Sequence, residues 1–355
     1  MTQTQADGHD ALIGRTPEET SSPAGEKHSR SLWIIILVFI IFIVTVFFTQ
    51  NKETIDWKDY RTGIELAKQL INYTKDIRLV SRNPKKVNES DQLMSADLSN
   101  PLKLDEAIKG SEVVYVCIAF DYKTAVWKES WPNFMKNLIA SCSKHKAKIV
   151  FVDNMYMYDK NHLGHMTEET PINPCSEKGK VRAEIFLMLM DEIQKGSVTG
   201  LVARSADFYG PGVVQSALTQ SVYYNLLKNK KPQWIGKLDV IHSFTYNKDI
   251  GKALAMLGNK PDAFNQVWHL PTTQEKLTSR QWIELMMKEM KNEKKIQTLS
   301  EGMLGFLGLF IPVLKEFKDI YYQYDGDYYF DSSKFNKRFN FTPTSPEEGI
   351  RKMVG

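Results

Sequence analysis

Short apolar segments that alternate with segments of helical periodicity constrain the fold of this chain more than any other feature. The apolar segments are rich in valine and isoleucine, and two are almost continuously apolar, which is typical of strands buried on both faces of a parallel sheet. They cover residues 77–81, 112–118, 148–153 and 198–203. Apolar residues recur at helical spacing within 64–71, 131–142 and 179–193. The alternation predicts an α/β fold with a doubly wound parallel sheet.

A second constraint is the apolar run at residues 32–48, which contains no charged residue, no glycine and no proline. A helix of about 17 to 20 residues crosses the hydrocarbon core of a bilayer. Arg30 and Lys52 flank the run, and Trp33 lies at one end, as aromatic residues do at a membrane interface. No small-residue cleavage site follows, which argues against a signal peptide, and a buried core helix usually has a polar stripe. We therefore expect one transmembrane helix at 32–49 within the lipid bilayer.

The residues before the apolar run are rich in Thr, Ser, Glu, Gly and Asp and show no apolar periodicity. This composition predicts a disordered tail over residues 1–31. The positive residues near the run are Lys27 and Arg30 before it and Lys52, Lys58, Arg61 and Lys68 after it. Because cytoplasmic flanks carry an excess of Lys and Arg, this bias predicts a single-pass membrane protein whose folded domain is cytoplasmic.

The charge balance and the cysteines exclude some classes of function. The chain has 46 Lys and Arg against 42 Asp and Glu, a formal net charge of +4 over 355 residues. Without a basic cluster, this charge does not indicate binding to nucleic acid. The cysteines Cys117, Cys142 and Cys175 form no CxxC pair and have no histidine at zinc-ligand spacing. We therefore expect neither a disulfide framework nor a metal site.

Seven segments together resemble one known family in the family's own order. They are LVSRNP (79–84), SADLSNPLKLDEAIKG (95–110), EVVYVCIAF (112–120), VDNMYMY (152–158), EETPINP (168–174), ARSADFYGPG (203–212) and YNKDIGKAL (246–254). On these segments the chain resembles the extended short-chain dehydrogenase/reductases of the NAD-dependent epimerase/dehydratase group, with atypical motifs. The resemblance implies a Rossmann-like NAD(P)-binding domain at 50–210 and a smaller C-terminal α+β substrate lobe at 211–355. It also implies a small-molecule substrate and is compatible with a homodimer.

The cofactor end of the chain departs from the family pattern. The dinucleotide fingerprint G-x-x-G-x-x-G matches only at its third glycine, Gly63, and the first two positions fall on Trp57 and Tyr60. Their side chains would occupy the space that the pyrophosphate needs. The preceding segment, 51–56, is charged and is a poor buried first strand. Either cofactor binding is degraded or lost, so that the chain uses no cofactor, or residues 50–62 reflect a fault in the gene model.

Downstream cofactor signals persist. By resemblance, Ser81 and Arg82 follow the second strand, where an NAD-preferring enzyme carries an acid. A guanidinium group there implies binding of the 2′-phosphate, and hence NADP(H) over NAD(H). Asp97 and Leu98 would contact the adenine, and Ala119 would follow the fourth strand. The alternatives are a solvated turn for Arg82 and a turn or helix cap for Asp97.

The catalytic motif also departs from the family, whose Tyr-x-x-x-Lys pair follows an upstream Ser or Thr. The lysine lowers the tyrosine pKa, so that the phenolate can take a proton from a substrate hydroxyl. Here Lys180 aligns with the lysine, Ser176 with the tyrosine and Asn154 with the upstream residue. A serine hydroxyl is a far weaker acid than a phenol, so the standard mechanism is unsupported. Asn154 can still hydrogen-bond a carbonyl oxygen, and we expect Lys180 to bind the ribose.

A replacement acid would have to come from the residues nearby. The candidates are Tyr156, Tyr158, His162 and His165. By resemblance Tyr158 is a structural tyrosine, and the histidines fall in a solvated loop, so Tyr156 joins the catalytic candidates. Lys178 and Arg182 are expected on the helix surface.

On the substrate side, Asp207 and Tyr209 would line the crevice by resemblance. The alternatives are a structural turn for Asp207 and a packed aromatic residue for Tyr209. The aromatic residues at 319–330 could form a stacking platform, but they predict instead a pair of strands that turns near Asp325.

Two further segments complete the C-terminal lobe. The segment 302–314 is apolar but too short to span a membrane, so we expect it to pack in the lobe. Ser345, Pro346 and Glu348 have the spacing of a helix start, with Ser345 as N-cap and a capping box.

These observations predict a membrane-anchored NAD(P)-dependent oxidoreductase that resembles the epimerases and dehydratases and acts on a small hydroxyl- or carbonyl-bearing substrate. The alternative is a non-catalytic nucleotide-sensing or scaffold module with the same fold, because a fold does not by itself decide a function.

Overall fold

The computed structural model describes residues 61–307 and 316–355, which belong to one compact unit spanning residues 56–355. The predicted tail and transmembrane helix lie outside these residues, as does most of the segment 50–62. Within the described ranges, no helix is both long enough and apolar enough to cross a membrane.

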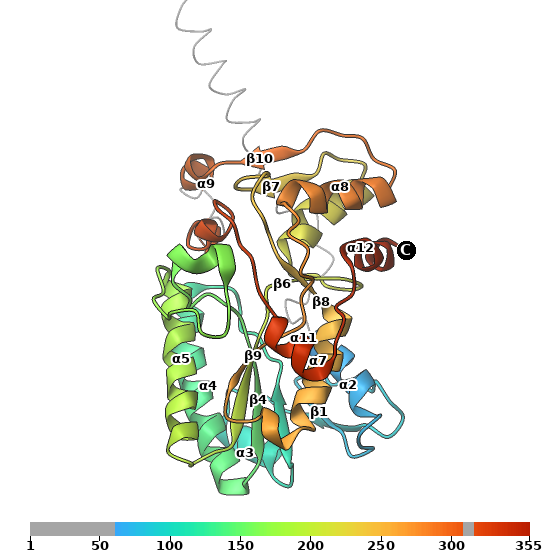
Figure 1. The fold of residues 1–355 in the computed structure, drawn as a ribbon. Coiled ribbons are helices and arrows are strands. Elements are labelled where there is room, and N and C mark those ends of the chain that lie inside the picture. Colours follow the sequence, from blue (N-terminus) through green and yellow to red (C-terminus); the bar gives the residue numbers. More distant parts are fainter. Residues whose placement is uncertain (1–60, 308–315) are drawn as a thin grey trace, which may run out of the picture. The chain divides into compact units, whose positions relative to one another are not determined.

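Two groups of parallel strands form the centre of this unit (Figure 1). One is a four-stranded sheet in the order β3-β4-β5-β9, and the other is the pair β1-β2. The strands are β1 (Arg78–Ser81), β2 (Gln92–Ser95), β3 (Val113–Val116), β4 (Lys148–Asp153), β5 (Gly200–Arg204) and β9 (Val267–His269). In the register, Tyr115 lies opposite Val150, and Ile149 lies opposite Gly200. The predicted doubly wound parallel sheet is confirmed.

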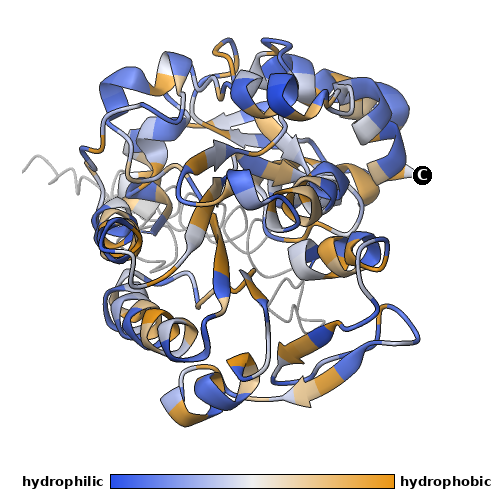
Figure 2. Cartoon of the chain, turned by 60° about the horizontal axis from the view of Figure 1, so that its bottom comes forward, coloured by the Kyte–Doolittle hydropathy of each residue, from blue (hydrophilic) through white to orange (hydrophobic). Residues whose placement is uncertain are grey.

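Helices cover both faces of the sheet (Figure 1). They are α2 (Arg61–Leu70) and α7 (Asn247–Gly258) on one face, and α3 (Pro101–Ile108), α4 (Thr124–His145) and α5 (Glu177–Gln194) on the other. Side chains of β4 alternate between two cores, because successive strand residues point to opposite faces. Ile149 and Phe151 pack with α3, α4 and α5, whereas Val150 and Val152 pack with α2 and α7. Figure 2 shows the resulting apolar strands between helices whose outer sides are polar.

No strand among the described residues pairs with both β1 and β3. In a doubly wound sheet the first strand of the chain lies between these two strands, and the segment predicted to form it lies outside the described residues. The helix that should follow it is nevertheless in place. Leu66 and Leu70 of α2 pack in the same core as Val150, and a Cβ on Gly63 would lie 4.0 Å from the Cβ of Cys117.

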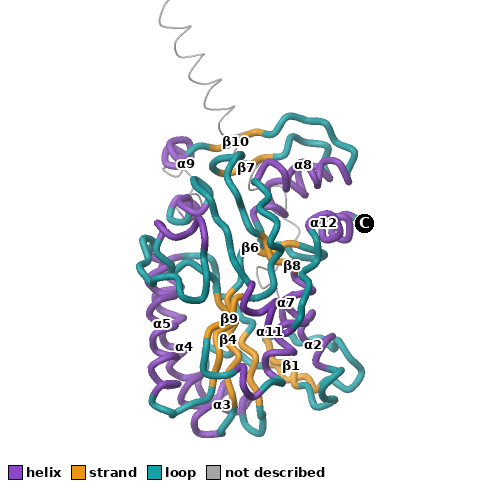
Figure 3. The backbone as a smooth tube through the Cα atoms, in the orientation of Figure 1, coloured by secondary structure: helices purple, strands orange, loops and turns teal. Residues whose placement is uncertain are grey.

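The C-terminal residues contribute to both parts of the unit. Helix α7 and strand β9 return to the central sheet, so the second half of the chain does not form a separate lobe alone. The remaining residues form an α+β substructure around the strand pairs β6-β8 and β7-β10 (Figure 3). Its elements are β6 (Asp207–Tyr209), β7 (Gln233–Ile235), β8 (Phe244–Tyr246), β10 (Gln297–Leu299), α8 (Ser279–Glu289) and α12 (Pro346–Val354). Trp234, Phe244 and Trp282 fill its core.

Short elements connect these parts. They are η1 (Lys160–His165), the π-helical turn η2 (Leu218–Tyr223), α6 (Tyr224–Leu227), η3 (Pro261–Ala263), α9 (Glu301–Leu307), η4 (Tyr321–Gln323) and α11 (Ser333–Phe339). Part of the apolar segment 302–314 lies in α9, and the rest lies outside the described residues. The prediction of a helix start at Ser345 is confirmed, because its side chain accepts a hydrogen bond from the Glu348 backbone N–H and Pro346 is the first helical residue.

The predicted strand pair at 319–330 is wrong. This segment forms the 3₁₀ turn η4, followed by bends and isolated bridges, and the rings of Tyr324 and Tyr328 stack on His242. The alternation of aromatic residues in this segment is typical of a strand, but Tyr324 and Tyr328 lie on either side of the His242 ring instead.

Candidate functional site

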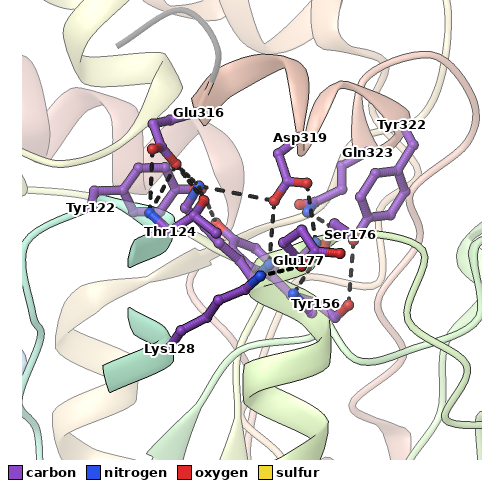
Figure 4. Close-up of polar contacts among 12 residues, drawn as sticks. Tyr122, Thr124, Lys128, Tyr156, Ser176, Glu177, Glu316, Asp319, Tyr322 and Gln323 are labelled. Carbon is purple, nitrogen blue, oxygen red and sulfur yellow. Dashed lines mark hydrogen bonds and ion pairs between the residues drawn. The ribbon is translucent and has the colours of Figure 1, made fainter. Parts of the chain in front are cut away.

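The candidate site lies where β3 and β4 end and α5 begins. Tyr122 follows β3, and Asn154 and Tyr156 follow β4. Two short polar side chains fix the turn after β4, because Asp153 Oδ1 accepts from the Asn154 N–H at 2.8 Å and Asn154 Oδ1 accepts from the Tyr156 N–H at 3.1 Å. Figure 4 shows the polar residues that gather around this turn and the start of α5.

Tyr156 and Tyr122 form the phenol pair of the site. Their hydroxyl oxygens are 3.2 Å apart, and the Tyr156 ring stacks on Trp127 with centroids 6.2 Å apart. Burial raises the pKa of both phenols, and the negative charge of Asp207 raises the pKa of Tyr156 further. Both phenols therefore hold their protons at neutral pH. They can donate hydrogen bonds to a substrate oxygen, but neither is a ready phenolate base.

Ser176, at the predicted position of the catalytic tyrosine, is the buried N-cap of α5. Its side chain accepts a hydrogen bond from the Gly179 N–H at 3.0 Å, which satisfies one of the free donors at the helix start. Gly179 lies against the turn after β4, because a Cβ there would be only 2.4 Å from the carbonyl oxygen of Tyr156. This first turn of α5 is therefore held tightly against the Tyr156 backbone.

The lysine that the fold turns inward is Lys178, not Lys180. Lys180 is exposed and pairs with Glu177 three residues earlier on the helix. Lys178 is fully buried, and its ammonium group pairs with Glu316, donates to Thr124 Oγ1 at 3.1 Å and lies 4.6 Å from the ring centre of Tyr122. The expectation that Lys178 lies on the helix surface is wrong, and the structure favours Lys178 over Lys180 as the lysine of this site.

Two carboxylates from one short segment lie over the starts of α4 and α5 (Figure 4). Glu316 accepts from the backbone N–H and the hydroxyl of Thr124, and Asp319 accepts from the Glu177 N–H at 3.1 Å. Carboxylates are favourable at these positive helix ends. Burial tends to raise the pKa of Glu316, but Lys178 and Thr124 outweigh this effect and the pKa is lowered. The Glu316 carboxylate therefore neutralises Lys178, and the pKa of Tyr122, whose ring lies beside the ammonium group, is raised by burial.

Arg182, also expected on the surface, is buried as well. Its Nε donates to Asp153 Oδ1 at 2.7 Å, and its guanidinium group lies 4.4 Å from the ring centre of Trp131. Arg204 approaches the other oxygen of Asp153 at 3.7 Å. Asp153 thus ties α5 to the carboxyl ends of β4 and β5.

The other candidates for a replacement acid lie away from this phenol pair. Tyr158 is buried, its hydroxyl accepts from Arg204 at 2.8 Å and lies 2.7 Å from His269 Nε2, and burial raises its pKa to about 12. This places Tyr158 in a structural network. His162 and His165 are exposed on η1, and His165 pairs with Asp331.

Asp207, predicted to face the substrate, joins a buried group that the sequence did not reveal. Its Oδ2 lies 3.0 Å from His242 Nε2 and accepts from the Tyr324 hydroxyl at 3.0 Å. Tyr209 instead lies in the core of the C-terminal substructure against Trp282. No local signal distinguishes His242 in the sequence, because its partners come from distant segments.

Known proteins share this architecture. A family model described as NAD(P)H-binding matches residues 61–185. The dTDP-glucose 4,6-dehydratase of Bacillus anthracis str. Ames in complex with NAD has a TM-score of 0.67 at 17% identity, over 82% of this chain and 92% of that chain. The UDP-glucuronic acid 4-epimerase of Bacillus cereus in complex with NAD has a TM-score of 0.67 at 16% identity, over 82% and 94% of the two chains.

A third solved structure agrees. The UDP-N-acetylglucosamine 4-epimerase of Methanobrevibacter ruminantium M1 has a TM-score of 0.66 at 19% identity, over 82% of this chain and 93% of that chain. The chain therefore has the parallel-sheet, Rossmann-type fold of these solved structures, and its residues 61–185 match the NAD(P)H-binding family model. No curated protein matches the sequence.

Within this fold, the predicted cofactor residues lie at the carboxyl ends of the strands. Arg82 is exposed directly after β1, and Ser81 is its last residue. Ala119 is exposed after β3, and Leu98 is half-buried after β2. Asp97 caps the turn before α3, because its Oδ1 accepts from the N–H and the hydroxyl of Ser99. Their roles toward a nucleotide remain predictions.

Proposed function

We propose that the protein is an NADP(H)-linked oxidoreductase that acts on a small hydroxyl- or carbonyl-bearing substrate, in the manner of the epimerases and dehydratases. The observation that carries this proposal is the exposed guanidinium group of Arg82 at the carboxyl end of β1, in a fold shared with two solved structures that are in complex with NAD. An arginine there can pair with a 2′-phosphate, whereas an acid would accept the ribose hydroxyl.

The residues at the adenosine side fit a dinucleotide. Gly63 opens α2 close to Cys117, Arg82 is available for the 2′-phosphate, and Ala119 presents only a methyl group after β3. The positions of the first two fingerprint glycines, Trp57 and Tyr60, lie outside the described residues. When bound, the nicotinamide would supply or accept a hydride.

The chain's own residues would bind and polarise the substrate oxygen. Tyr156 stays protonated because burial raises its pKa, and its hydroxyl is hydrogen-bonded to the hydroxyl of Tyr122. Asn154 lies two residues before it at the end of β4. Phenol and amide donors at this position can stabilise negative charge that develops on a carbonyl oxygen.

Turnover tests the proposal. We expect the protein to oxidise NADPH, followed at 340 nm, in the presence of a reactive dicarbonyl such as 9,10-phenanthrenequinone. Tyr156→Phe keeps the ring on Trp127 but removes the donor, so kcat should fall by about 10²-fold. Tyr73→Phe, at an exposed tyrosine beyond α2, is the matched control and should leave kcat unchanged. A parent protein that never consumes NADPH with any carbonyl would contradict the proposed reaction.

A second candidate function follows from the ion pair of Lys178. Because Glu316 neutralises this lysine, the Tyr-Lys chemistry of the family has no counterpart at the start of α5. A module that binds nucleotide without turnover would have no need of that chemistry. Saturable NADPH binding in a parent protein without turnover would favour this nucleotide-sensing function over the oxidoreductase.

We also propose that the protein is attached to a membrane through residues 32–49, with the folded domain in the cytoplasm. The support is the uncharged apolar run and the excess of positive residues that follows it.

A further inference from the structure

We propose that Asp207 is the proton-transfer group of this site, and that His242 and Tyr324 are positioning residues that hold its carboxylate. This inference rests on the proposed oxidoreductase function and names the residue that replaces the missing catalytic tyrosine.

The two oxygens of Asp207 have different surroundings. Oδ2 receives two hydrogen bonds, from His242 Nε2 and from the Tyr324 hydroxyl, each at 3.0 Å. Oδ1 has no hydrogen-bond partner among the described residues, and the side chain is 18% exposed. Such a carboxylate is fixed through one oxygen and leaves the other available to a ligand.

Within residues 61–307 and 316–355, the surroundings of His242 leave its imidazole one polar contact, the hydrogen bond to the Asp207 carboxylate. It is fully buried, and its ring lies between Tyr324 and Tyr328, with centroids 5.0 and 4.5 Å away and planes tilted by only 12° and 9°. Because a carboxylate oxygen accepts, Nε2 carries the hydrogen. The other nitrogen, Nδ1, is buried and has no hydrogen-bond partner in the described part of the chain. A buried imidazole with an unpaired nitrogen is unfavourable for stability. We infer that this imidazole is retained because it donates a hydrogen bond to Asp207.

The groups around Asp207 leave it as the base of the site. Its carboxylate is held by His242 from the segment before β8 and by Tyr324 from the segment after η4, and Tyr328 stacks on the same His242 ring. Tyr122 and Tyr156, from the ends of β3 and β4, pack against the core that contains Tyr324. The two buried cations of α5 are already paired, Lys178 with Glu316 and Arg182 with Asp153. Tyr156 packs against the core that contains Tyr324, which holds the Asp207 carboxylate, and burial and the charge of Asp207 raise the pKa of Tyr156 and keep it protonated. A protonated phenol and a carboxylate joined in this way assign the two roles.

In oxidation of a substrate alcohol, the O–H bond would break and its proton would pass to Asp207 Oδ1, while a bound oxidised nicotinamide would accept the hydride from the C–H bond. The substrate carbon would be oxidised by the two electrons that the cofactor takes up. In the reverse direction the protonated Asp207 returns the proton to the carbonyl oxygen, and Tyr156 donates a hydrogen bond to that oxygen in both directions.

The test uses the full-length protein, NADPH and 9,10-phenanthrenequinone. Asp207→Asn keeps the shape and the acceptor for Tyr324 but cannot carry the proton, so kcat should fall by about 10²- to 10⁴-fold. NADPH affinity, measured by fluorescence, and the melting temperature show whether the variant is folded and still binds nucleotide. Asp325→Asn, at an exposed carboxylate paired with Lys237, is the matched control and should behave as the parent.

His242 is tested separately. His242→Phe keeps the stack between the two tyrosines but removes the donor to Asp207, so the pH dependence of kcat should move while NADPH affinity stays. His242→Gln restores an N–H donor and should recover part of the parent profile. An Asp207→Asn variant with the kcat and pH profile of an active parent would overturn the role of Asp207 alone. A parent that binds NADPH without turnover would overturn the oxidoreductase and the Asp207 proposal together.

Discussion

Lys178 is fully buried, and its ammonium group pairs with the carboxylate of Glu316, which lies 138 positions later in the chain. The pair joins the start of α5, beside the predicted catalytic motif, to the C-terminal substructure. Thr124 completes it by donating to Glu316 and accepting from Lys178. A lysine that could have activated a phenol is therefore used to hold two parts of the protein together.

Breaking this pair should destabilise the protein. Glu316→Gln removes the nearer counter-charge and leaves the buried Lys178 with only Asp319, 3.9 Å away. Loss of one partner of a buried pair costs about 3–5 kcal/mol, and the loss here should approach that range. Unfolding in urea measures the effect. The double variant Lys178→Met/Glu316→Leu should recover most of the loss, and Lys180→Met, at an exposed lysine, should change the unfolding free energy by less than about 0.5 kcal/mol. If the Lys180 and Glu316 variants lose the same free energy of unfolding, the buried pair stabilises the protein no more than an exposed lysine does.

The burial of Lys178 and Arg182 shows what sequence reasoning could not reach. The strands were predictable because their valines and isoleucines are buried on both faces, and Ser345 was predictable because a helix cap is local. The inward face of α5 was not predictable from the sequence. Its buried charges are stabilised by Glu316 and Asp153, which lie on other elements. When these partners are unknown, a lysine and an arginine near the start of a helix are expected on the surface.

Partners that lie far apart in the sequence also explain why the role of His242 was not predicted. Asp207 was predictable from a motif, but its partners come from a loop and from an aromatic segment that alternates like a strand. Only the tertiary arrangement shows that the tyrosines at 324 and 328 stack on one imidazole ring.

His269 should make the stability of the protein depend on pH. Burial lowers its pKa to about 3, from 6.5 for an ordinary histidine, because the ring is fully enclosed, and this effect outweighs the hydrogen bond from its Nδ1 to the Asp331 carbonyl, which raises the pKa. As the pH falls below 6.5, the unfolded chain binds a proton that the folded chain does not. The free energy of unfolding should therefore fall by up to about 1.4 kcal/mol per pH unit.

Urea unfolding between pH 6.5 and 5 measures this slope above the range where carboxylates titrate. His269→Gln should flatten it, whereas His162→Gln, at an exposed histidine, should not. A slope that survives in His269→Gln would assign the pH dependence to other groups.

The apolar run at 32–48 should decide where the protein is found. Full-length protein should partition with membranes and resist extraction with alkaline carbonate, because about 17 to 20 apolar residues suffice to span a bilayer. The truncated chain 51–355 should be released into the supernatant. Recovery of full-length protein in the soluble fraction would argue against the anchor.

The central claim, that this fold still binds NADP(H), is tested most directly by titrating the full-length protein with NADPH and with NADH. Arg82 should favour NADPH by about one to two decades, because an arginine–phosphate contact is worth roughly 1.5–3 kcal/mol. Arg82→Asp should abolish or reverse the preference, and Arg351→Asp, at an exposed arginine on α12, should keep it. Saturable binding with these preferences is the predicted result. Equal affinity for the two dinucleotides, or no binding of either, would contradict it.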